Sequence, residues 1–261
     1  MHPLLNIAER AARAAGNVIV RHVGRIDTLN ISSKGLNDFV SEVDVNAERA
    51  VVDVIRKAYP SHAILGEETG RDGNSDHVWI IDPLDGTTNF LHGFPHFAVS
   101  IAVEVRGRIE HGLVFDPMRH EVFAASRGAG ARLDDRRIRV TNNGLAGGLI
   151  GTGFPFRDMA RLDSYVEGLK SLMTEAAGIR RAGAAALDLA YVAAGRLDGF
   201  WEYGLKPWDL AAGALLVREA GGLVTDPRGG EDYMRTGDVV AANPRALKAI
   251  LARLARAEPR G

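Results

Sequence analysis

The chain has 261 residues, of which 46% are hydrophobic and 25% charged, and its formal net charge is −1. This composition is typical of a globular protein of one or two domains, and the near-neutral charge gives no general attraction to nucleic acid or to acidic membranes. The absence of cysteine excludes disulfides, thiolate nucleophiles and thiolate metal sites.

The first predicted elements are two amphipathic helices. Apolar residues recur at helical spacing over residues 3–22, and Gly24 ends this helix. Charges in the same stretch interrupt the apolar core that a secretory signal needs, and no apolar run in the chain approaches the ~20 residues of a membrane helix. Residues 34–44 are expected to form a polar loop that leads into a second helix over about 44–58. We therefore expect a cytoplasmic protein with no membrane segment.

Short strands follow the second helix. Residues 64–65 should form a strand that turns at 66–70, and 71–76 should be a solvated loop. The apolar run at 77–81 indicates a buried strand, and because proline cannot continue a central strand, Asp82 should lie at its end. An antiparallel meander comes next, with a hairpin signal at Arg106-Gly107. Its predicted strands are 98–104, 108–115, 121–125 and 131–140, the last of which turns at Asp134-Asp135.

The pattern changes near residue 142, where strands and helices begin to alternate. The predicted strands are 149–152, 179–182, 197–202 and 239–242, and the predicted helices are 158–174, 184–194, 207–220 and 244–255. Glycine and asparagine between residues 142 and 148 indicate a linker. We therefore divide the chain into an α+β half, residues 1–142, and an α/β half, residues 143–261.

The stretch Asp82-Pro83-Leu84-Asp85-Gly86-Thr87-Thr88 carries the strongest chemical signal. Its two carboxylates are close in sequence and repel each other unless a cation lies between them. The backbone amides and hydroxyls of the Gly-Thr-Thr sequence are groups that hold a phosphate at a helix N-terminus. The stretch therefore predicts a divalent-metal and phosphate site.

Other polar residues have simpler interpretations when each is taken alone. Asp209 begins an apolar helix, where the helix dipole favours an acidic residue, and Glu67 suits a solvated loop. We interpret Arg180-Arg181 as solvated charges, and Trp201 and Trp208 as packing residues. The eight histidines show no metal-ligand spacing. Residue spacing alone therefore does not connect the distant acidic residues to Asp82 and Asp85.

Three separate motifs can be read together. They are the stretch from Asp82 to Thr88, Gly66-Glu67-Glu68, and Trp208-Asp209-Leu210-Ala211-Ala212-Gly213. Their residues, order and separation resemble the inositol monophosphatase family, and its bacterial SuhB-type subgroup in particular. Asp116-Pro117-Met118-Arg119 and the stretch 185–196 resemble the subgroup. The resemblance covers the chain from the first helix to the last and implies a layered αβαβα sandwich.

The resemblance also implies two to three Mg2+ ions. Glu67, Asp82 and the Leu84 carbonyl would hold the first ion, and Asp82, Asp85 and Asp209 the second, with a third weaker ion bound near Glu67 through water. Magnesium prefers such oxygen ligands and shares them with substrate phosphate. The attacking group would be a water, oriented by Thr87, whose hydroxyl pairs with Asp44. The implied catalytic residues are thus Thr87, Asp44 and Glu67.

By the same resemblance, the phosphate would contact the Gly86 and Thr87 amides beside Leu84, Asp85 and Asp209. The alcohol would contact Glu202 and the loop Gly183-Ala184-Ala185. Relatives often carry a hydroxyl at the position of Ala184, so one contact with the sugar ring is in doubt. Lys34 matches a basic residue near the catalytic loop, and its role stays open.

The implied activity is magnesium-dependent, lithium-sensitive hydrolysis of myo-inositol 1-phosphate and related monophosphates by a homodimer. A covalent aspartyl-phosphate mechanism is disfavoured, because its aspartates lie two residues apart and these lie three apart. Fructose-1,6-bisphosphate or nucleotide 3′-phosphates are alternative substrates. The resemblance also suggests a regulatory role in ribosomal-RNA transcription antitermination through RNA polymerase and Nus-factor partners, without direct nucleic-acid binding.

Overall fold

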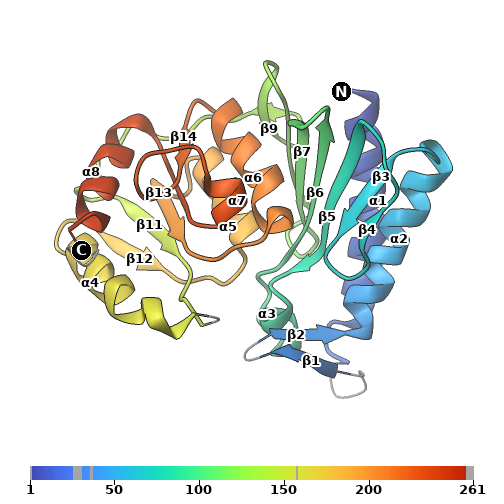
Figure 1. Cartoon of the computed structure of the whole chain (residues 1–261), viewed down its shortest axis with the longest axis horizontal. Helices are drawn as coiled ribbons and strands as arrows, with labels where there is room; N and C mark the ends of the chain where they lie inside the picture. The colour runs from blue at the N-terminus through green and yellow to red at the C-terminus, as the bar shows by residue number, and fades with distance from the viewer. Residues whose placement is uncertain (1, 26–30, 36–37, 157, 257–261) are drawn as a thin grey trace.

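The computed structural model describes residues 2–25, 31–35, 38–156 and 158–256, with the backbone alone for 31–35 and 38–40. Figure 1 shows five layers in the order helices, sheet, helices, sheet, helices. The predicted αβαβα sandwich is therefore confirmed. Lys34 lies on a described strand, but its side chain is outside the described part of the chain.

The outer layer on one side holds helices α1 (Pro3–His22) and α2 (Glu42–Ala58). Both were predicted, and α2 begins two residues earlier than expected because Ser41 caps it, with the Ser41 hydroxyl accepting from the Val43 amide. The expected polar loop before α2 is wrong in part. Residues Ile31–Gly35 (β1) and Asp38–Ser41 (β2) pair there as an antiparallel two-stranded sheet.

The first large sheet has eight strands in the order β10-β9-β8-β7-β6-β5-β3-β4. Their bounds are β3 Ala63–Gly66, β4 Gly70–Asp72, β5 His77–Asp85, β6 Ala98–Val105, β7 Arg108–Asp116, β8 Glu121–Ser126, β9 Gly130–Leu133 and β10 Arg136–Arg137. Strands β6 to β10 form the predicted antiparallel meander, β5 pairs with β6 in the antiparallel sense, and β3 pairs with β5 in parallel. Strand β4 occupies part of the expected loop at 71–76.

Strand β5 does not end at Asp82. It continues through Pro83 to Asp85, where the helix α3 (Thr87–Leu91) follows. Asp82 lies opposite Ser100 and Asp85 opposite Ala98, so three steps on β5 match two on β6 and the strand bulges between them. A bulge leaves a residue outside the ladder, and Pro83, which has no amide hydrogen, is tolerated there. The bulge places both aspartates at one end of the sheet.

The second large sheet has five strands in the order β12-β11-β13-β15-β14. Their bounds are β11 Leu149–Thr152, β12 Gly178–Arg180, β13 Gly199–Glu202, β14 Leu223–Thr225 and β15 Val239–Ala242. The middle layer holds α5 (Ala185–Ala193) and α6 (Pro207–Glu219), and the outer layer holds α4 (Leu162–Met173) and α8 (Pro244–Leu254). A 3-10 turn, η2 (Met159–Arg161), precedes α4, and α7 is Tyr233–Thr236. The sequence patterns did not predict β14 or α7, which are very short.

The middle layer packs against both sheets. One continuous core joins Ile80 and Phe123 of the first sheet to Leu189 of α5 and Leu216 of α6, and then to Phe200 of the second sheet. Further cores fill the outer faces, beneath α1 and α2 on one side and beneath α4 and α8 on the other. The division at residues 142 and 143 falls in the connection between β10 and β11, and it stays a prediction. Among the described helices, none has the length and apolarity needed to cross a bilayer.

Candidate active site

A cavity of about 390 Å3 opens where β5, α3, β13 and the start of α6 meet. Its size is in the range of small-molecule sites. Most of the residues expected to act on substrate or metal line it: Glu67, Asp82, Leu84, Asp85, Gly86, Thr87, Gly183, Ala185, Glu202 and Asp209. Ala184 and Asp44 are the exceptions, and both are buried beside it, each with 1% exposure.

Three carboxylates meet in this cavity. Asp82, Asp85 and Asp209 each offer an oxygen, and these oxygens all lie within 4.8 Å of one another. Burial raises the pKa of Asp82 well above its ordinary value, and the charges of Glu67, Asp85 and Asp209 raise it further. Burial likewise raises the pKa of Asp85, with Asp209 the next cause. An all-oxygen set of this kind fits a hard divalent cation, which would remove the repulsion.

Backbone amides fix the orientation of each carboxylate. The Leu84 amide donates to Asp82 Oδ1 at 2.9 Å, across the bulge in β5. The Ala186 amide, at the start of α5, donates to Asp85 Oδ2 at 2.7 Å. The Lys206 amide donates to Asp209 Oδ2 at 2.7 Å, so Asp209 also caps α6, as its first-turn position suggested. Each of the three side chains is therefore held by a backbone hydrogen bond.

Thr87 is connected to α2 through a buried aspartate. Its hydroxyl lies 2.8 Å from Asp44 Oδ1 and 3.1 Å from the Leu84 carbonyl oxygen. The other Asp44 oxygen accepts from the Ser41 amide at 2.8 Å and from the Ser41 hydroxyl at 2.6 Å. Burial raises the pKa of Asp44, and these hydrogen bonds oppose that rise. The contact between Thr87 and Asp44 that the family resemblance implied is present.

The turn at Gly86 brings the two halves of the chain together. Gly86 caps α3 with φ of +96°, and a Cβ there would lie 3.0 Å from the His96 carbonyl oxygen and 3.3 Å from that of Gly183. Only glycine fits both the conformation and the space. Asn89, one turn along α3, donates to the Ala182 carbonyl at 2.9 Å, which holds the 182–183 segment against α3.

Glu67 also lines the cavity, and the turn that carries it contacts a residue that the sequence patterns did not single out. Glu48 of α2 is fully buried and accepts from the Glu68 and Thr69 amides, both at 2.9 Å. A Cβ on Gly66 would lie 2.6 Å from the Glu48 carboxylate. The turn that carries Glu67 is thus wrapped around a buried carboxyl group. In the sequence, the position of Glu48 on the apolar face of α2 is the feature that could have identified it as a buried residue with polar partners.

The far wall of the cavity contains aromatic and basic residues. The Arg181 guanidinium lies 5.4 Å from the ring centre of Phe154 and 5.2 Å from that of Phe156, and all three residues line the cavity. Arg181 was expected to be a solvated charge. It is exposed, yet it lies over two rings at the mouth of the site. Trp208 also lines the cavity, whereas Trp201 is a buried packing residue, as predicted.

Comparisons with known proteins agree with this geometry. The sequence profile of the Inositol monophosphatase family matches residues 1–260. The chain is 56% identical to the Nus factor SuhB of Pseudomonas aeruginosa over 258 residues, covering 96% of this chain and 95% of that protein. The crystal structure of the extragenic suppressor protein SuhB from Bartonella henselae superposes with a TM-score of 0.94 at 46% identity, covering 97% and 98% of the two chains. The IMPase of Thermotoga maritima gives 0.90 at 34% identity, covering 98% of both chains.

Proposed function

The chain belongs to the inositol monophosphatase family, and we propose that it is a magnesium-dependent phosphatase that hydrolyses myo-inositol 1-phosphate and related monophosphates. The observation that carries this proposal is the meeting of Asp82, Asp85 and Asp209 within 4.8 Å in a cavity of small-molecule size. These carboxylates come from distant parts of the sequence and lie close together although their charges repel one another. Such an arrangement supports a cation-dependent activity.

Two to three Mg2+ ions are proposed, held by Glu67, Asp82, the Leu84 carbonyl, Asp85 and Asp209. When bound, they supply positive charge to the phosphate and acidify the attacking water. The protein's own groups orient that water. Because the Thr87 hydroxyl donates its proton to Asp44 at 2.8 Å, its oxygen can accept a hydrogen bond from a water in the cavity. Burial raises the pKa of Asp44, which suits this carboxyl to take up, through the Thr87 hydroxyl, the proton that the water loses.

The phosphate is proposed to bind at the Gly86 and Thr87 amides, beside Leu84, Asp85 and Asp209. The alcohol is proposed to contact Glu202 and the 183–185 loop on the opposite wall. Gly153 makes room for Glu202, because a Cβ at Gly153 would lie 1.9 Å from the Glu202 carboxyl carbon. Ala184 offers no hydroxyl and is buried, so a direct polar contact from its side chain to the ring is not part of the proposal.

The test is a substrate panel measured with and without Mg2+. Inositol 1-phosphate, fructose-1,6-bisphosphate and 3′-phosphoadenosine-5′-phosphate should be compared for phosphate release, with lithium as inhibitor and Asp209→Asn as the inactive reference. We expect inositol 1-phosphate to give the highest kcat/KM, and the activity to require Mg2+. If wild type and Asp209→Asn release phosphate equally, the proposed site is wrong. If another compound is strongly preferred, the proposed substrate is wrong.

A second function is favoured by the name of the Pseudomonas relative, Nus factor SuhB. We propose that this chain also binds protein partners in the transcription machinery, such as RNA polymerase or Nus factors. A pull-down with wild type and with Asp85→Asn separates the two roles. Retention of these partners by both forms supports a binding role that is independent of hydrolysis. If neither form retains a transcription protein, the second function is discarded.

A further inference from the structure

Two segments from the second half of the chain form one wall of the candidate active site. One segment, which precedes α4, contributes Phe154, Pro155, Phe156, Asp158 and Arg161 to the cavity lining. The other connects β13 to α6 and contributes Tyr203, Gly204 and Leu205. Glu202, at the end of β13, directly precedes the second segment and also lines the cavity. The two segments are more than 40 positions apart in the sequence, so their spacing depends on contacts between them.

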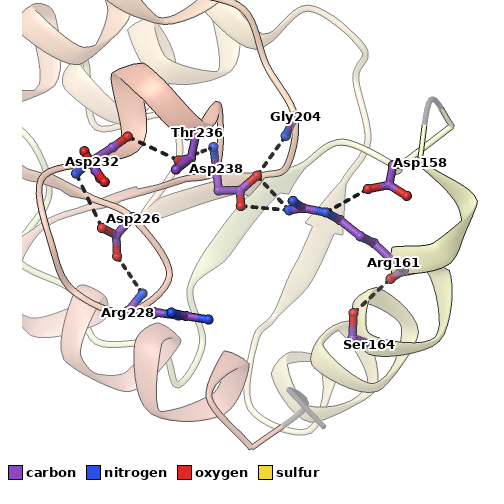
Figure 2. Close-up of polar contacts among 9 residues, drawn as sticks. All are labelled: Asp158, Arg161, Ser164, Gly204, Asp226, Arg228, Asp232, Thr236 and Asp238. Carbon is purple, nitrogen blue, oxygen red and sulfur yellow. Dashed lines mark hydrogen bonds and ion pairs between the residues drawn. The ribbon is translucent and has the colours of Figure 1, made fainter. Parts of the chain in front are cut away.

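One carboxylate joins the two segments, and Figure 2 shows how. Arg161 Nη1 donates to both oxygens of Asp238, at 2.8 and 2.7 Å. The Gly204 amide donates to Asp238 Oδ1 at 3.0 Å. Asp238 itself lies just before β15, outside the cavity lining. It therefore connects the two segments of the wall from behind.

Further contacts fix the direction of both partners. Arg161 Nε donates to Asp158 Oδ2 at 3.0 Å, and the guanidinium lies 5.6 Å from the ring centre of Tyr203. The Leu205 amide donates to the Gly237 carbonyl at 3.0 Å. Gly237 has φ of +76°, and a Cβ there would lie 2.1 Å from the Leu205 carbonyl oxygen. The residue before Asp238 is therefore pressed against the 203–205 segment.

A second cavity, of about 550 Å3, lies on the other side of this connection. Arg161 and Tyr203 line both cavities, and Asp238 lines only the second one. The Arg161–Asp238 pair is thus part of the partition between them. The Asp238 side chain is 18% exposed and that of Arg161 40% exposed, so the pair lies between solvent and the active-site wall. Loss of the pair would open the wall toward the second cavity.

We propose that Arg161 and Asp238 are positioning residues that set the width of the alcohol-binding side of the active site, and that they thereby select substrates by the size of the alcohol. This inference rests on the proposed phosphatase function. The metal-binding carboxylates proposed on β5 do not contact the pair, and the Asp209 carboxylate is held by the Lys206 amide and not by Asp238. The pair should therefore affect recognition of the alcohol more than the hydrolysis of the phosphate ester.

The kinetic test compares substrates that share the phosphate and differ in the alcohol. Asp238→Ala and Arg161→Ala should each raise KM for inositol 1-phosphate about three- to tenfold, as expected for loss of a charge-assisted hydrogen bond. For the smaller glycerol 2-phosphate, KM should change by less than about twofold, and kcat for both substrates should change less than KM. The double variant should lose less than the two single losses added together, because both single variants remove the Arg161–Asp238 contact. Asp238→Asn keeps an acceptor for the Gly204 amide and should recover part of the loss.

The matched control is Asp232→Ala. Asp232 pairs with Arg235 on the border of the second cavity, and neither residue lines the active site. This variant should leave both KM values unchanged. Equal changes in KM for the large and the small substrate in Asp238→Ala would overturn the proposal, since a purely structural role affects both alike.

A measurement without substrate separates this inference from the proposed function. Amide hydrogen exchange at Gly204 and Leu205 should become faster in Asp238→Ala and in Arg161→Ala, and should stay unchanged in Asp232→Ala. Unchanged exchange in all three variants would show that the pair does not hold the wall. If the exchange responds as expected but wild type hydrolyses no phosphate ester, the pair holds the wall as described and the proposed function is wrong. The role of the pair in substrate selection is then wrong as well.

Discussion

The buried aspartates of the candidate active site lower the stability of the folded, metal-free protein when they are ionised. Asp82 is 2% exposed and Asp85 9%, and burial raises the pKa of both. A carboxyl whose folded-state pKa lies above its unfolded value binds protons more tightly in the folded protein. As pH rises from about 4 through the raised pKa, the folded state therefore loses stability relative to the unfolded state. The contribution of these two groups should therefore make the metal-free protein less stable at pH 8 than at pH 5.

Removing one of these charges should stabilise the metal-free protein. Asp85→Asn keeps an oxygen that can accept from the Ala186 amide and removes the repulsion from Asp209. In EDTA at pH 8, we expect its melting temperature to rise by about 2–4 °C, which corresponds to ~1 kcal/mol in a chain of this size. Phosphate release should fall about 10³-fold, because the metal site loses a ligand.

Thermal unfolding with and without about 10 mM MgCl2 compares the same variant with wild type. This concentration is on the order of the dissociation constants of weak carboxylate sites, or above them. Magnesium should raise the melting temperature of wild type and have little effect on Asp85→Asn. A lower melting temperature for Asp85→Asn in EDTA would contradict the view that repulsion between these carboxylates strains the metal-free site.

His111 provides a pH effect of opposite sign, far from the cavity. Burial and the neighbouring His2 lower the pKa of His111 to about 4, while Glu110 opposes the shift. Its ring stacks on His2 with centres 4.2 Å apart, and Nδ1 lies 2.8 Å from the Ser126 hydroxyl. Because the folded-state pKa lies below the unfolded value of 6.5, the neutral ring stabilises the folded protein. This stabilisation is complete above pH 6.5 and is lost as pH falls from 6.5 toward 4.

We expect wild type to lose roughly 1 kcal/mol more than His111→Phe between pH 7 and pH 5, after allowance for water that reaches the ring. Urea unfolding of both forms at the two pH values, with EDTA present, measures this difference. Parallel losses in the two proteins would show that His111 does not titrate in this range. Because the comparison uses the difference between the forms, the opposite contribution of Asp82 and Asp85 cancels.

At the scale of single elements, α2 supports the active site from beneath. Its face toward the first sheet carries Asp44, which contacts Thr87, and Glu48, which holds the turn after β3. The two residues are one turn apart and therefore lie on the same side of the helix. One helix thus contacts both Thr87 and the turn that carries Glu67.

Loss of the Glu48 carboxylate should loosen the turn that carries Glu67. Glu48→Ala removes the acceptor of the partly buried Glu68 and Thr69 amides, and we expect it to raise the Mg2+ concentration for half-maximal activity by about tenfold. Glu48→Gln keeps one acceptor oxygen and should be intermediate. Asp53→Ala, at an exposed position on the same helix, is the control and should behave as wild type. A fall in kcat with unchanged magnesium dependence would argue against this positioning role.

The sequence patterns predicted those elements that have a long periodic stretch or a strong turn signal. They failed for elements whose conformation depends on contacts with distant parts of the chain. Helix α1 and the hairpin at Arg106-Gly107 have strong local signals, and both have the predicted form. The bulge through Pro83 could not be predicted, because it depends on pairing with Ser100 and Ala98 of another strand. The short α7 has too few residues to show a period.

The candidate site shows the same limit. Asp82 and Asp85 were singled out by local chemistry, whereas Asp209 and Glu67 were connected to them only through the family resemblance. Their proximity is created by the packing of α6 between the sheets, which no local pattern encodes. Glu48 and the Arg161–Asp238 pair were not singled out, and Arg181 was interpreted as a solvated charge, for a related reason. Each owes its place to a partner distant in the sequence.

At the scale of the whole molecule, the middle helical layer makes the two halves depend on each other. Helices α5 and α6 belong to residues 143–261, yet they cover the inner face of the first sheet, where Val78, Ile80, Val114 and Phe123 are all less than 5% exposed. The same helices supply the Ala186 amide and Asp209 to the cavity. A site assembled from both halves therefore forms only when the core between them has formed.

We accordingly expect the predicted halves to unfold as one unit. In urea, far-UV circular dichroism and tryptophan fluorescence should give coincident midpoints, because Trp79 lies in the first sheet and Trp201 in the second. A fragment of residues 1–142 should not fold alone. It would expose the inner face of the first sheet, a larger apolar patch than the few hundred Å2 that monomers usually tolerate. Separate midpoints for the two probes, or cooperative unfolding of the isolated fragment, would instead establish residues 1–142 as an independent domain.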